Sequence, residues 1–251
     1  MILYPNAKIN IGLNVLEERA DGYHEISSVF YPVKGLFDIL EIIPSDVFCF
    51  TSTGFIIPGE GNICEKAFKL LELDFGISPV KIHLHKQIAI GSGLGGGSAN
   101  GACTLVALNQ IFSLQLSKQQ LEQYALQIGA DCPFFIDNTP KYVSGIGDRM
   151  RSLDLDLSHF DLRVKFSNLH ISTEEAYSSV MSKLPEKSLL DLINQPIENW
   201  KERIENDFET SVFKQYPALK RIKEQLYADG AIYASMTGSG SAFYGIFPAN
   251  L

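Results

Sequence analysis

Residues 91 to 98 read GSGLGGGS, so five of these eight positions are glycine. A loop with so few side chains lets backbone N–H groups converge on an anion without interference from Cβ atoms. A helix that starts directly after such a loop adds the positive end of its dipole at the same point. The run therefore predicts a phosphate-binding loop. A flexible linker or a hairpin turn is the alternative, but linkers have polar flanks and hairpins need fewer residues.

The segments on either side of this loop predict a strand before it and helices after it. Apolar residues alternate with polar ones between positions 80 and 90, and only Lys86 breaks this period of two. After the loop, Ser98 stands where a helix N-cap is expected, and apolar residues recur at helical spacing behind it. A second helix is predicted between a cap at Ser117 and a stop at Gly129.

Familiar nucleotide motifs are excluded by this context. Gly91, Gly93 and Gly96 satisfy G-x-G-x-x-G, but the dinucleotide fingerprint needs a strand after its helix and an acidic residue about twenty positions on. The Walker pattern places Lys directly before Ser or Thr, where this chain has Gly97. The H-R-D triplet of protein kinases does not occur in the sequence, and the D-F-G triplet at 74–76 precedes the glycine-rich loop instead of following it. The loop is therefore a glycine-rich phosphate site of another kind.

Composition and charge favour an enzyme that acts on a small molecule. The chain has 251 residues, 45% of them hydrophobic, and a net charge of −8. Because no basic stripe is present, we expect no nucleic-acid partner. The four cysteines have no C-x-x-C spacing, which indicates reduced thiols, and the sequence has neither a membrane-length apolar run nor a secretory signal. We therefore expect a cytoplasmic monomer or homodimer without membrane contact.

The remaining chain predicts a mixed α and β organisation in two domains. Residues 7–15 alternate as a strand with one polar face, which places Lys8 and Asn10 on the same side. Residues 45–61 are rich in turn residues, and short strands are expected near the end of the first domain, at 132–136 and 141–143. This first domain covers residues 1–153.

A second domain is predicted over residues 154–251. Alternation indicates a strand at 160–166, and a capping box at 172–175 begins a helix that continues past Tyr177. The other expected elements are helices at 200–208 and 217–228 and strands at 232–236 and 242–247. A second glycine-rich loop, at 237–241, joins these two strands and could face the first.

With these segments in order, the chain resembles the GHMP small-molecule kinase superfamily, and within it the 4-diphosphocytidyl-2-C-methyl-D-erythritol kinases. The segments that carry the resemblance are 5–10 (PNAKIN), 19–24 (RADGYH), 91–99 (GSGLGGGSA), 129–134 (GADCPF) and 236–240 (MTGSG). Their order and spacing agree over nearly the whole chain. The Gly-Tyr-His segment and the triple glycine favour this group over the mevalonate, homoserine and galactose kinases.

The sequence departs from the family pattern at three places. Ala89 stands where the family often has Pro, and Ala99 stands where a second Ser is common. These differences affect loop rigidity and one hydroxyl contact, but they leave the glycines in place. Relatives usually carry a further helix and strand after the point where this chain ends, at Leu251. We therefore expect a C-terminal domain that lacks its last elements.

The resemblance implies roles for residues in a phosphoryl transfer. Asp131 matches the general base, and Lys8 matches the cation that orients the acceptor hydroxyl; a solvated carboxylate and a surface lysine are the alternatives. Ser98 is the candidate for a phosphate or Mg²⁺ contact. The positions that match ATP-binding residues are Asn62, Lys86, Ala89, Ile90, Gly91, Ser92, Gly93, Leu94, Gly95, Gly96, Gly97, Ser98 and Ala99. ATP and Mg²⁺ are the implied cofactors.

The resemblance also implies a site for a cytosine base. An aromatic face for stacking and polar groups at the base edge are the physical requirements. Tyr23 and His24 match the family's base-binding pair, and Tyr177 falls where a second stacking aromatic is expected. Asn10 and Gly238 match further substrate contacts. Any one of these aromatic residues alone would more often be an ordinary half-buried side chain.

Together, these features predict an α+β, two-domain GHMP-kinase-like fold, with a ribosomal-protein-S5-like N-terminal domain and a ferredoxin-like C-terminal domain. The implied activity is ATP-dependent phosphorylation of the 2-hydroxyl of 4-diphosphocytidyl-2-C-methyl-D-erythritol, in the non-mevalonate isoprenoid pathway. The alternatives are another GHMP small-molecule kinase, a nicotinamide-dependent oxidoreductase that uses the same glycines, and an RNA-binding module. The acidic pI of about 5.1 argues against RNA binding.

Overall fold

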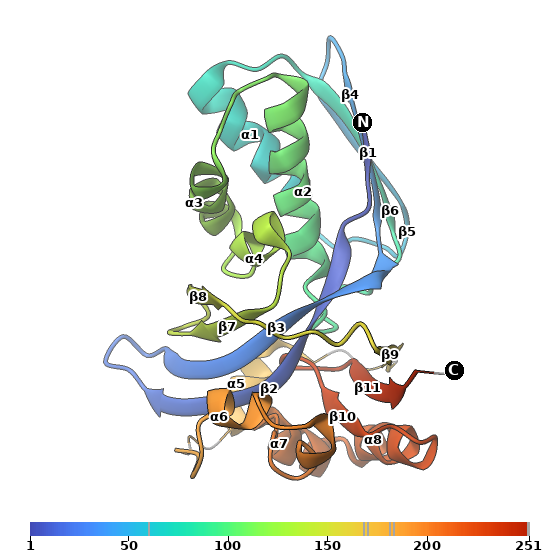
Figure 1. Ribbon diagram of the computed structural model, residues 1–251. Coiled ribbons are helices and arrows are strands. Elements are labelled where there is room, and N and C mark those ends of the chain that lie inside the picture. Colours follow the sequence, from blue (N-terminus) through green and yellow to red (C-terminus); the bar gives the residue numbers. More distant parts are fainter. Residues whose placement is uncertain (60, 168, 170, 181, 183, 250–251) are drawn as a thin grey trace. The chain divides into compact units, whose positions relative to one another are not determined.

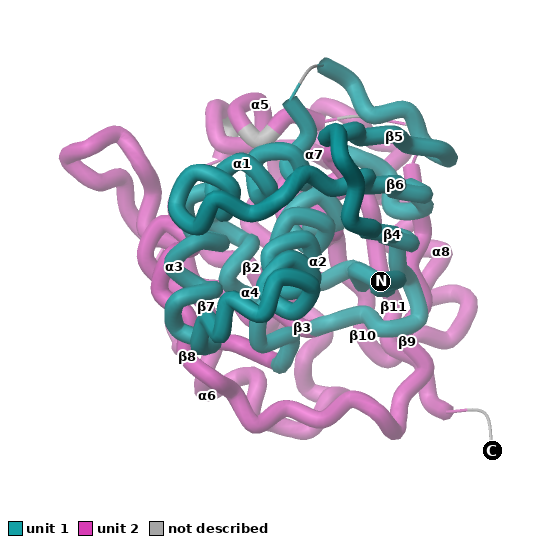
Figure 2. The backbone as a smooth tube through the Cα atoms, turned by 90° about the horizontal axis from the view of Figure 1, so that it is seen from above, with its two compact units in different colours: residues 1–8, 32–90, 95–139 teal, residues 9–31, 91–94, 140–251 magenta. Residues whose placement is uncertain are grey.

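The computed structural model describes residues 1–59, 61–167, 169, 171–180, 182 and 184–249 (Figure 1). The chain forms two compact units (Figure 2). Unit 1 contains residues 1–8, 32–90 and 95–139, and unit 2 contains residues 9–31, 91–94 and 140–251. The division falls inside two strands and inside the glycine-rich loop. A single domain boundary after residue 153 stays a prediction.

Unit 1 is built on a sheet in the order β1-β4-β6-β5. Its strands are β1 (Ile2–Leu3), β4 (Ile39–Pro44), β5 (Cys49–Gly54) and β6 (Val80–Lys86). In β4 and β6, which are antiparallel, Leu40 lies opposite Leu84, whereas β5 runs parallel to β6. Alternate residues of β6 are buried, as expected for a sheet with one covered face.

Helices cover one face of this sheet (Figure 1). They are α1 (Ile63–Phe75), α2 (Gly96–Ile111), α3 (Lys118–Ile128) and α4 (Cys132–Asp137). Burial of apolar side chains between the helices and the sheet is the main stabilising contribution in this unit. The core includes Leu40, Ile42, Phe68, Leu71, Ile82, Leu84, Leu105 and Leu108.

Unit 2 contains two further sheets. The first has the order β2-β3-β7-β8, with β2 (Asn6–Glu18), β3 (His24–Phe37), β7 (Lys141–Ser144) and β8 (Arg149–Ser152); β2 begins and β3 ends in unit 1. The second is antiparallel in the order β10-β11-β9, with β9 (Phe160–Lys165), β10 (Tyr233–Met236) and β11 (Phe243–Pro248).

The helical elements of unit 2 lie between β9 and β10 in the sequence. They are α5 (Thr173–Ser179), α6 (Leu189–Ile193), a 3₁₀ turn (Ile197–Asn199), α7 (Phe208–Gln215) and α8 (Pro217–Ala228). Helix α8 packs on β10 and β11. The core of this unit includes Leu13, Val15, Phe208, Leu219, Leu226, Met236 and Phe243. Within the described residues, no helix is long and apolar enough to cross a membrane.

Several local predictions are confirmed. The Ser117 hydroxyl and the Gln120 side chain form a capping box at the start of α3, which ends at Gly129. Ser172 caps α5 by accepting a hydrogen bond from the Glu175 N–H group. Helix α8 has the predicted limits, and α2 is followed by another helix rather than a strand. The dinucleotide fold is therefore excluded by the connectivity as well.

The limits of two elements beside the glycine-rich loop differ from the prediction. Strand β6 ends at Lys86, not at Ile90, and α2 begins at Gly96 with Gly95 as its N-cap, not at Ser98. Glycine has low helix propensity, so its presence in the first turn of a helix reflects tertiary packing. A Cβ atom on Gly96 would lie 2.8 Å from the Ile88 side chain, which shows how closely α2 meets the end of the strand.

Two other predictions were wrong, and one strand was not predicted. Residues 132–136 form helix α4 rather than a strand, because Pro133 suits the first turn of a helix and a short apolar run does not distinguish the two. Residues 200–208 are not one helix: the Glu205 carbonyl accepts from the Leu13 N–H group, and Asp207 donates to the Leu13 carbonyl. The turn-rich segment 45–61 contains strand β5, which pairs with β6.

Candidate active site

The glycine-rich loop follows an alternating backbone pattern. Gly91, Gly93 and Gly95 have φ angles of 69°, 78° and 68°, in the left-handed region that favours glycine. Alternation of left-handed residues with ordinary ones turns successive N–H groups toward a common point, the geometry of an anion-binding nest. The spacing of these three glycines is therefore explained by backbone conformation.

The N-terminus of α2 supplies further donors. The first intrahelical hydrogen bond runs from the Ala99 N–H group to the Gly95 carbonyl, at 2.9 Å. By helix geometry, the N–H groups of residues 96–98 have no acceptor within the helix. This end of α2 thus offers backbone donors together with the positive end of the dipole of a 16-residue helix.

Lys8 and Asp131 are brought together in unit 1. The Lys8 Nζ atom lies 3.5 Å from Asp131 Oδ2, and the two side chains are 4% and 32% exposed. Burial lowers the pKa of Lys8 below its ordinary value, and the Asp131 carboxylate offsets part of this effect. Lys8 is thus not a surface lysine. The pair combines a desolvated cation with a carboxylate that solvent, or an acceptor hydroxyl, can reach.

This pair lies beside the start of α2. A Cβ atom on Gly95 would lie 3.0 Å from Lys8 Cγ and 3.0 Å from Phe135 Cζ. The Ser98 side chain hydrogen-bonds with the thiol of Cys132, the residue after Asp131. Burial raises the pKa of Cys132 to about 12, so this cysteine stays a thiol at neutral pH. The anion-binding end of α2 and the Lys8–Asp131 pair therefore form one local group.

Within unit 2, the second glycine-rich loop faces the first, as predicted. The Thr237 hydroxyl donates to the Gly93 carbonyl at 3.1 Å, and the Ala242 N–H group donates to the Ser92 carbonyl at 3.1 Å. A Cβ atom on Gly238 would lie 3.2 Å from Gly93 Cα. Glycine at 93 and 238 thus permits a close backbone approach that the sequence alone did not specify.

Asn10 lies in the interior of unit 2. Its side-chain amide donates to the Ser28 hydroxyl at 2.9 Å, its backbone N–H group donates to Thr237 Oγ1 at 3.0 Å, and the Tyr244 hydroxyl donates to its carbonyl at 2.9 Å. Asn10 is only 2% exposed. These contacts give it a part in holding Thr237, a residue that our sequence analysis did not single out.

Two of the three aromatic residues predicted for base binding lie together. The rings of His24 and Tyr177 have centroids 5.3 Å apart and planes inclined by 34°. Tyr177 also meets Phe208 edge-on, with centroids 4.8 Å apart. Tyr23 is 61% exposed. Unit 2 therefore presents an aromatic pair with a neighbouring exposed tyrosine.

Two residues predicted near the adenosine have structural contacts of their own. The Asn62 side chain caps α1 by accepting from the Cys64 N–H group at 2.8 Å. Lys86 is buried and its Nζ atom lies 2.5 Å from Asp38 Oδ2. Burial lowers the pKa of Lys86, and Asp38 offsets part of this effect. Asp38 was not among the predicted site residues, although a single carboxylate inside the apolar run 36–40 is a recognisable signal.

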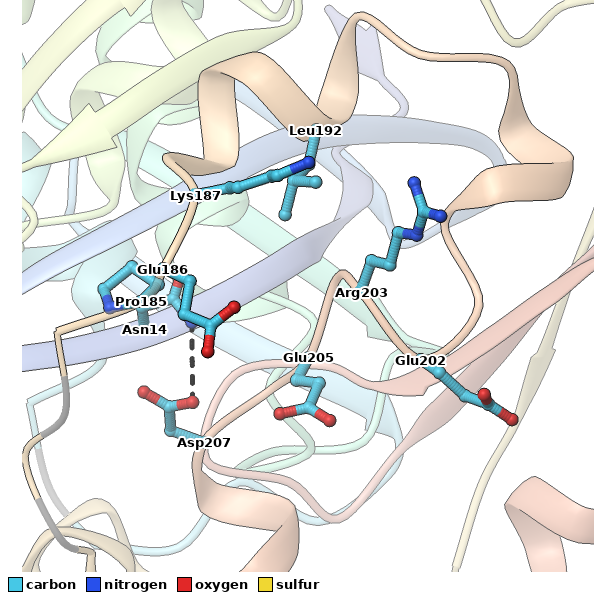
Figure 3. A pocket seen from close by; sticks show the side chains of 9 residues that line it. All are labelled: Asn14, Pro185, Glu186, Lys187, Leu192, Glu202, Arg203, Glu205 and Asp207. Carbon is cyan, nitrogen blue, oxygen red and sulfur yellow. Dashed lines mark hydrogen bonds between the residues drawn. The ribbon is translucent and has the colours of Figure 1, made fainter.

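Unit 2 also contains a separate pocket of about 410 Å³ (Figure 3). Its lining is dominated by charged side chains of both signs. Asn14 and Asp207 are joined by a hydrogen bond of 3.4 Å (Figure 3). The lining residues are Asn14, Pro185, Glu186, Lys187, Leu192, Glu202, Arg203, Glu205 and Asp207. The residues predicted to be functional do not contribute to this pocket.

Two family models match the chain. The model described as the GHMP kinases N terminal domain matches residues 62–138, and the model described as GHMP kinases C terminal matches residues 186–250. The first of these regions includes Lys86, the glycine-rich loop and Asp131. The second includes the Thr237–Gly238 segment.

Curated proteins and a solved structure are similar over almost the whole chain. A protein of Parabacteroides distasonis named 4-diphosphocytidyl-2-C-methyl-D-erythritol kinase is 48% identical, covering 98% of this chain and 92% of the relative. One of the same name from Azobacteroides pseudotrichonymphae is 46% identical, covering 98% and 93%. A crystal structure of 4-(cytidine 5'-diphospho)-2C-methyl-D-erythritol kinase superposes with a TM-score of 0.84 at 30% identity, covering 98% of this chain and 90% of that chain.

The glycine-rich loop, the Lys8–Asp131 pair and the two matching domain models thus occur in one chain whose sequence aligns with these relatives over 98% of its length. Identity of nearly half the residues over this length implies a common fold and common descent. The chain belongs to the GHMP kinase family and, within it, to the group of the 4-diphosphocytidyl-2-C-methyl-D-erythritol kinases.

Proposed function

We propose that this protein transfers the γ-phosphoryl group of ATP to the 2-hydroxyl of 4-diphosphocytidyl-2-C-methyl-D-erythritol. Membership of the GHMP kinases implies ATP as the donor. The names of the relatives support the acceptor. The observation that carries the reaction type is the Lys8–Asp131 pair beside the N-terminus of α2, because phosphoryl transfer requires an anion site next to a group that activates a hydroxyl.

Each part of this group has a chemical task. The N–H groups of residues 91–98 and the dipole of α2 bind the phosphates of ATP and stabilise charge on the transferred group. Asp131 accepts the proton of the attacking hydroxyl. Lys8 orients that hydroxyl, positions the Asp131 carboxylate and offsets negative charge in the transition state. At the two ends of this segment, the proposed ATP contacts are Ala89, Ile90 and Ala99.

We further propose that Mg²⁺ accompanies ATP. This ion is usually held by one or two protein oxygens together with phosphates, not by an all-protein site. That expectation fits the described residues, which contain no cluster of three or more His, Cys, Asp or Glu able to hold a metal. The Ser98 hydroxyl, in the first turn of α2, is the proposed protein ligand. When bound, the ion would neutralise phosphate charge.

For the acceptor, we propose that the cytosine base stacks against the aromatic group of Tyr23, His24 and Tyr177. The close approach of the last two rings supports this assignment. Asn10 and Gly238 hold the second glycine-rich loop near Gly93 and are proposed acceptor contacts. For the adenosine of ATP, Asn62 and Lys86 remain the proposed contacts. The cytoplasmic location and the monomeric or homodimeric state stay predictions.

A coupled ADP-release assay over a panel of acceptors tests this function. We expect turnover with 4-diphosphocytidyl-2-C-methyl-D-erythritol and little with mevalonate, homoserine or galactose. Phosphorus NMR of the product should show a new phosphomonoester on the erythritol part. ADP release that favours mevalonate or homoserine would instead assign the protein to another GHMP specificity. Nucleotide binding by NAD but not by ATP would exclude the kinase.

A further inference from the structure

Asp38 is a fully buried carboxylate that bonds to groups on both sides of the glycine-rich loop. It lies between β3 and β4 with 0% exposure. Its Oδ1 atom accepts from the N–H groups of Gln87, at 2.7 Å, and Ile88, at 2.8 Å. Its Oδ2 atom accepts from Lys86 Nζ, at 2.5 Å, and from the side-chain amide of Asn100, at 2.9 Å. All these residues belong to unit 1.

The donors come from two places that the loop connects. Residues 86–88 are where the chain leaves β6, directly before the loop, and Asn100 is near the start of α2, directly after it. A single side chain therefore fixes both ends of the segment 89–95. Glycines give this segment more conformational freedom than other residues would, and ordering it costs binding free energy unless its ends are already held.

The charge balance of this cluster also suits an anion site. A buried carboxylate by itself would be costly and would repel phosphates near the start of α2. Lys86 compensates this charge directly. Its Nζ atom lies 2.9 Å from the place that a Cβ atom on Gly96 would occupy, so the ammonium lies beneath the first residue of α2. Asn100 is neutral, so its hydrogen bond links Asp38 to α2 without adding charge.

We propose that Asp38 is a positioning residue for ATP: through Gln87, Ile88 and Asn100 it holds the two ends of the phosphate-binding loop, with Lys86 as its counter-ion. This inference rests on the proposed function. It differs from a purely structural role, since that role would lower stability without a selective effect on nucleotide binding. It also explains why Lys86 breaks the apolar pattern of its strand while pointing to the buried side.

The test compares two asparagines on the same helix. Asn100→Ala removes the hydrogen bond that links Asp38 to α2. Asn109→Ala is the matched control, because Asn109 exchanges two hydrogen bonds with the backbone of Leu116, of 3.2 and 2.9 Å, at the other end of α2. We would measure urea unfolding, calorimetric binding of a non-hydrolysable ATP analogue, and KM for the acceptor.

We expect both variants to lose stability, but only Asn100→Ala to bind the ATP analogue about tenfold more weakly. The KM for the acceptor should stay within about twofold of the wild type. Equal analogue affinity in Asn100→Ala and wild type, or an equal loss in Asn109→Ala, would overturn the positioning role. A wild-type protein that does not bind the analogue would instead contradict the proposed function itself.

If Asn100→Ala does not fold, Asn100→Asp provides a second test. The introduced carboxyl faces Asp38, with Lys86 and the Cys64 thiol nearby. Two buried carboxylates repel each other, but they share a proton as the pH falls. We expect weaker analogue binding than in wild type at about pH 8.5 and recovery toward the wild-type value at about pH 6. If the ratio of the analogue affinity of Asn100→Asp to that of the wild type did not change with pH, the proposal would be contradicted.

Discussion

At the residue scale, the proposed chemistry depends on a cation and a carboxylate whose environments differ. Lys8 is almost completely buried, whereas about a third of the Asp131 side chain is exposed. Desolvation makes the charge of Lys8 costly, and the neighbouring carboxylate offsets part of that cost. The carboxylate remains accessible to a hydroxyl. This asymmetry suits a base held in place by a cation better than it suits a surface ion pair.

Removal of either member should impair chemistry more than binding. Asp131→Asn keeps the size of the side chain but removes the proton acceptor, so single-turnover phosphoryl transfer should fall by about 10² to 10⁴. Lys8→Ala should cost a comparable factor, and the double variant should lose much less than the product of the two, because the residues act as one unit. ATP affinity should barely change in Asp131→Asn. Fully multiplicative losses would show that the pair is not the catalytic centre.

The pKa of Lys8 should respond to the charge of Asp131. In wild type, burial lowers this pKa and the Asp131 carboxylate raises it in part. Asp131→Asn removes the raising effect, so the pKa of Lys8 should move further below its ordinary value, and the neutral form should appear at lower pH. NMR titration of ¹³C-lysine, with Lys8→Ala to assign the signal, measures this shift. The same titration of the wild-type protein is the reference.

At the scale of elements, the start of α2 is determined by packing rather than by helix propensity. Gly95 and Gly96 begin the helix although glycine disfavours it. Gly95 adopts the left-handed region and lies against Lys8 and Phe135, and Gly96 lies against Ile88. A Cβ atom at Gly96 would clash with Ile88, and one at Gly95 would be tightly packed at a φ that side chains rarely adopt. The loop is thus a close junction between a strand end and a helix, and not a flexible linker.

Substitutions at this junction should affect ATP binding selectively. Gly96→Ala introduces a Cβ atom 2.8 Å from Ile88, and Gly95→Ala adds strain at a φ of 68°, so both should weaken binding of an ATP analogue by more than about tenfold. Gly101→Ala is the control, because its Cβ atom would be equally crowded, 2.8 Å from Ile63 and Ile128, but farther along α2. Calorimetry on folded variants measures their affinity for the ATP analogue. An unchanged affinity in Gly96→Ala would refute the role of the loop in ATP binding.

At the scale of the whole molecule, each compact unit carries one part of the proposed function. Unit 1 contains the Lys8–Asp131 pair and the start of α2. Unit 2 contains the His24–Tyr177 aromatic pair and the second glycine-rich loop, which includes Thr237. The strands β2 and β3 and the glycine-rich loop contribute residues to both units. The residues proposed to recognise the base and those proposed to activate the hydroxyl thus belong to different compact units.

Base recognition should be specific for cytosine. Stacking on His24 and Tyr177 tolerates any base, whereas hydrogen bonds at the base edge reject a base whose donors and acceptors are exchanged, since buried polar groups are then left unpaired. We therefore expect cytidine diphosphate to compete with the acceptor and uridine diphosphate to compete at least about tenfold more weakly. Inhibition constants from the ADP-release assay measure this difference. Equal inhibition by the two nucleotides would remove the base-recognition proposal.

Much of the local architecture was predictable from the sequence. The capping box at Ser117, the limits of α8 and the strand beginning near Val80 depend on residues close together in the chain, and the structure confirms them. The glycine-rich loop was also identified, because five glycines in eight residues disfavour a regular helix or strand and suit a close backbone approach. Such features are recognisable because capping, turn formation and amphipathic periodicity involve neighbours within a few positions.

Only the tertiary structure decided where the elements beside the loop begin and end, and which residues hold them. Asp38 lies 62 positions before Asn100, and Thr237 lies 144 positions after Gly93. Hydrogen bonds over such separations leave no periodic trace in the sequence, since they depend on how the chain returns to the same place. The same cause accounts for the segment 200–208, whose pairing with Leu13 prevents one continuous helix. Local patterns thus indicated the candidate residues, and long-range packing determined how they are arranged.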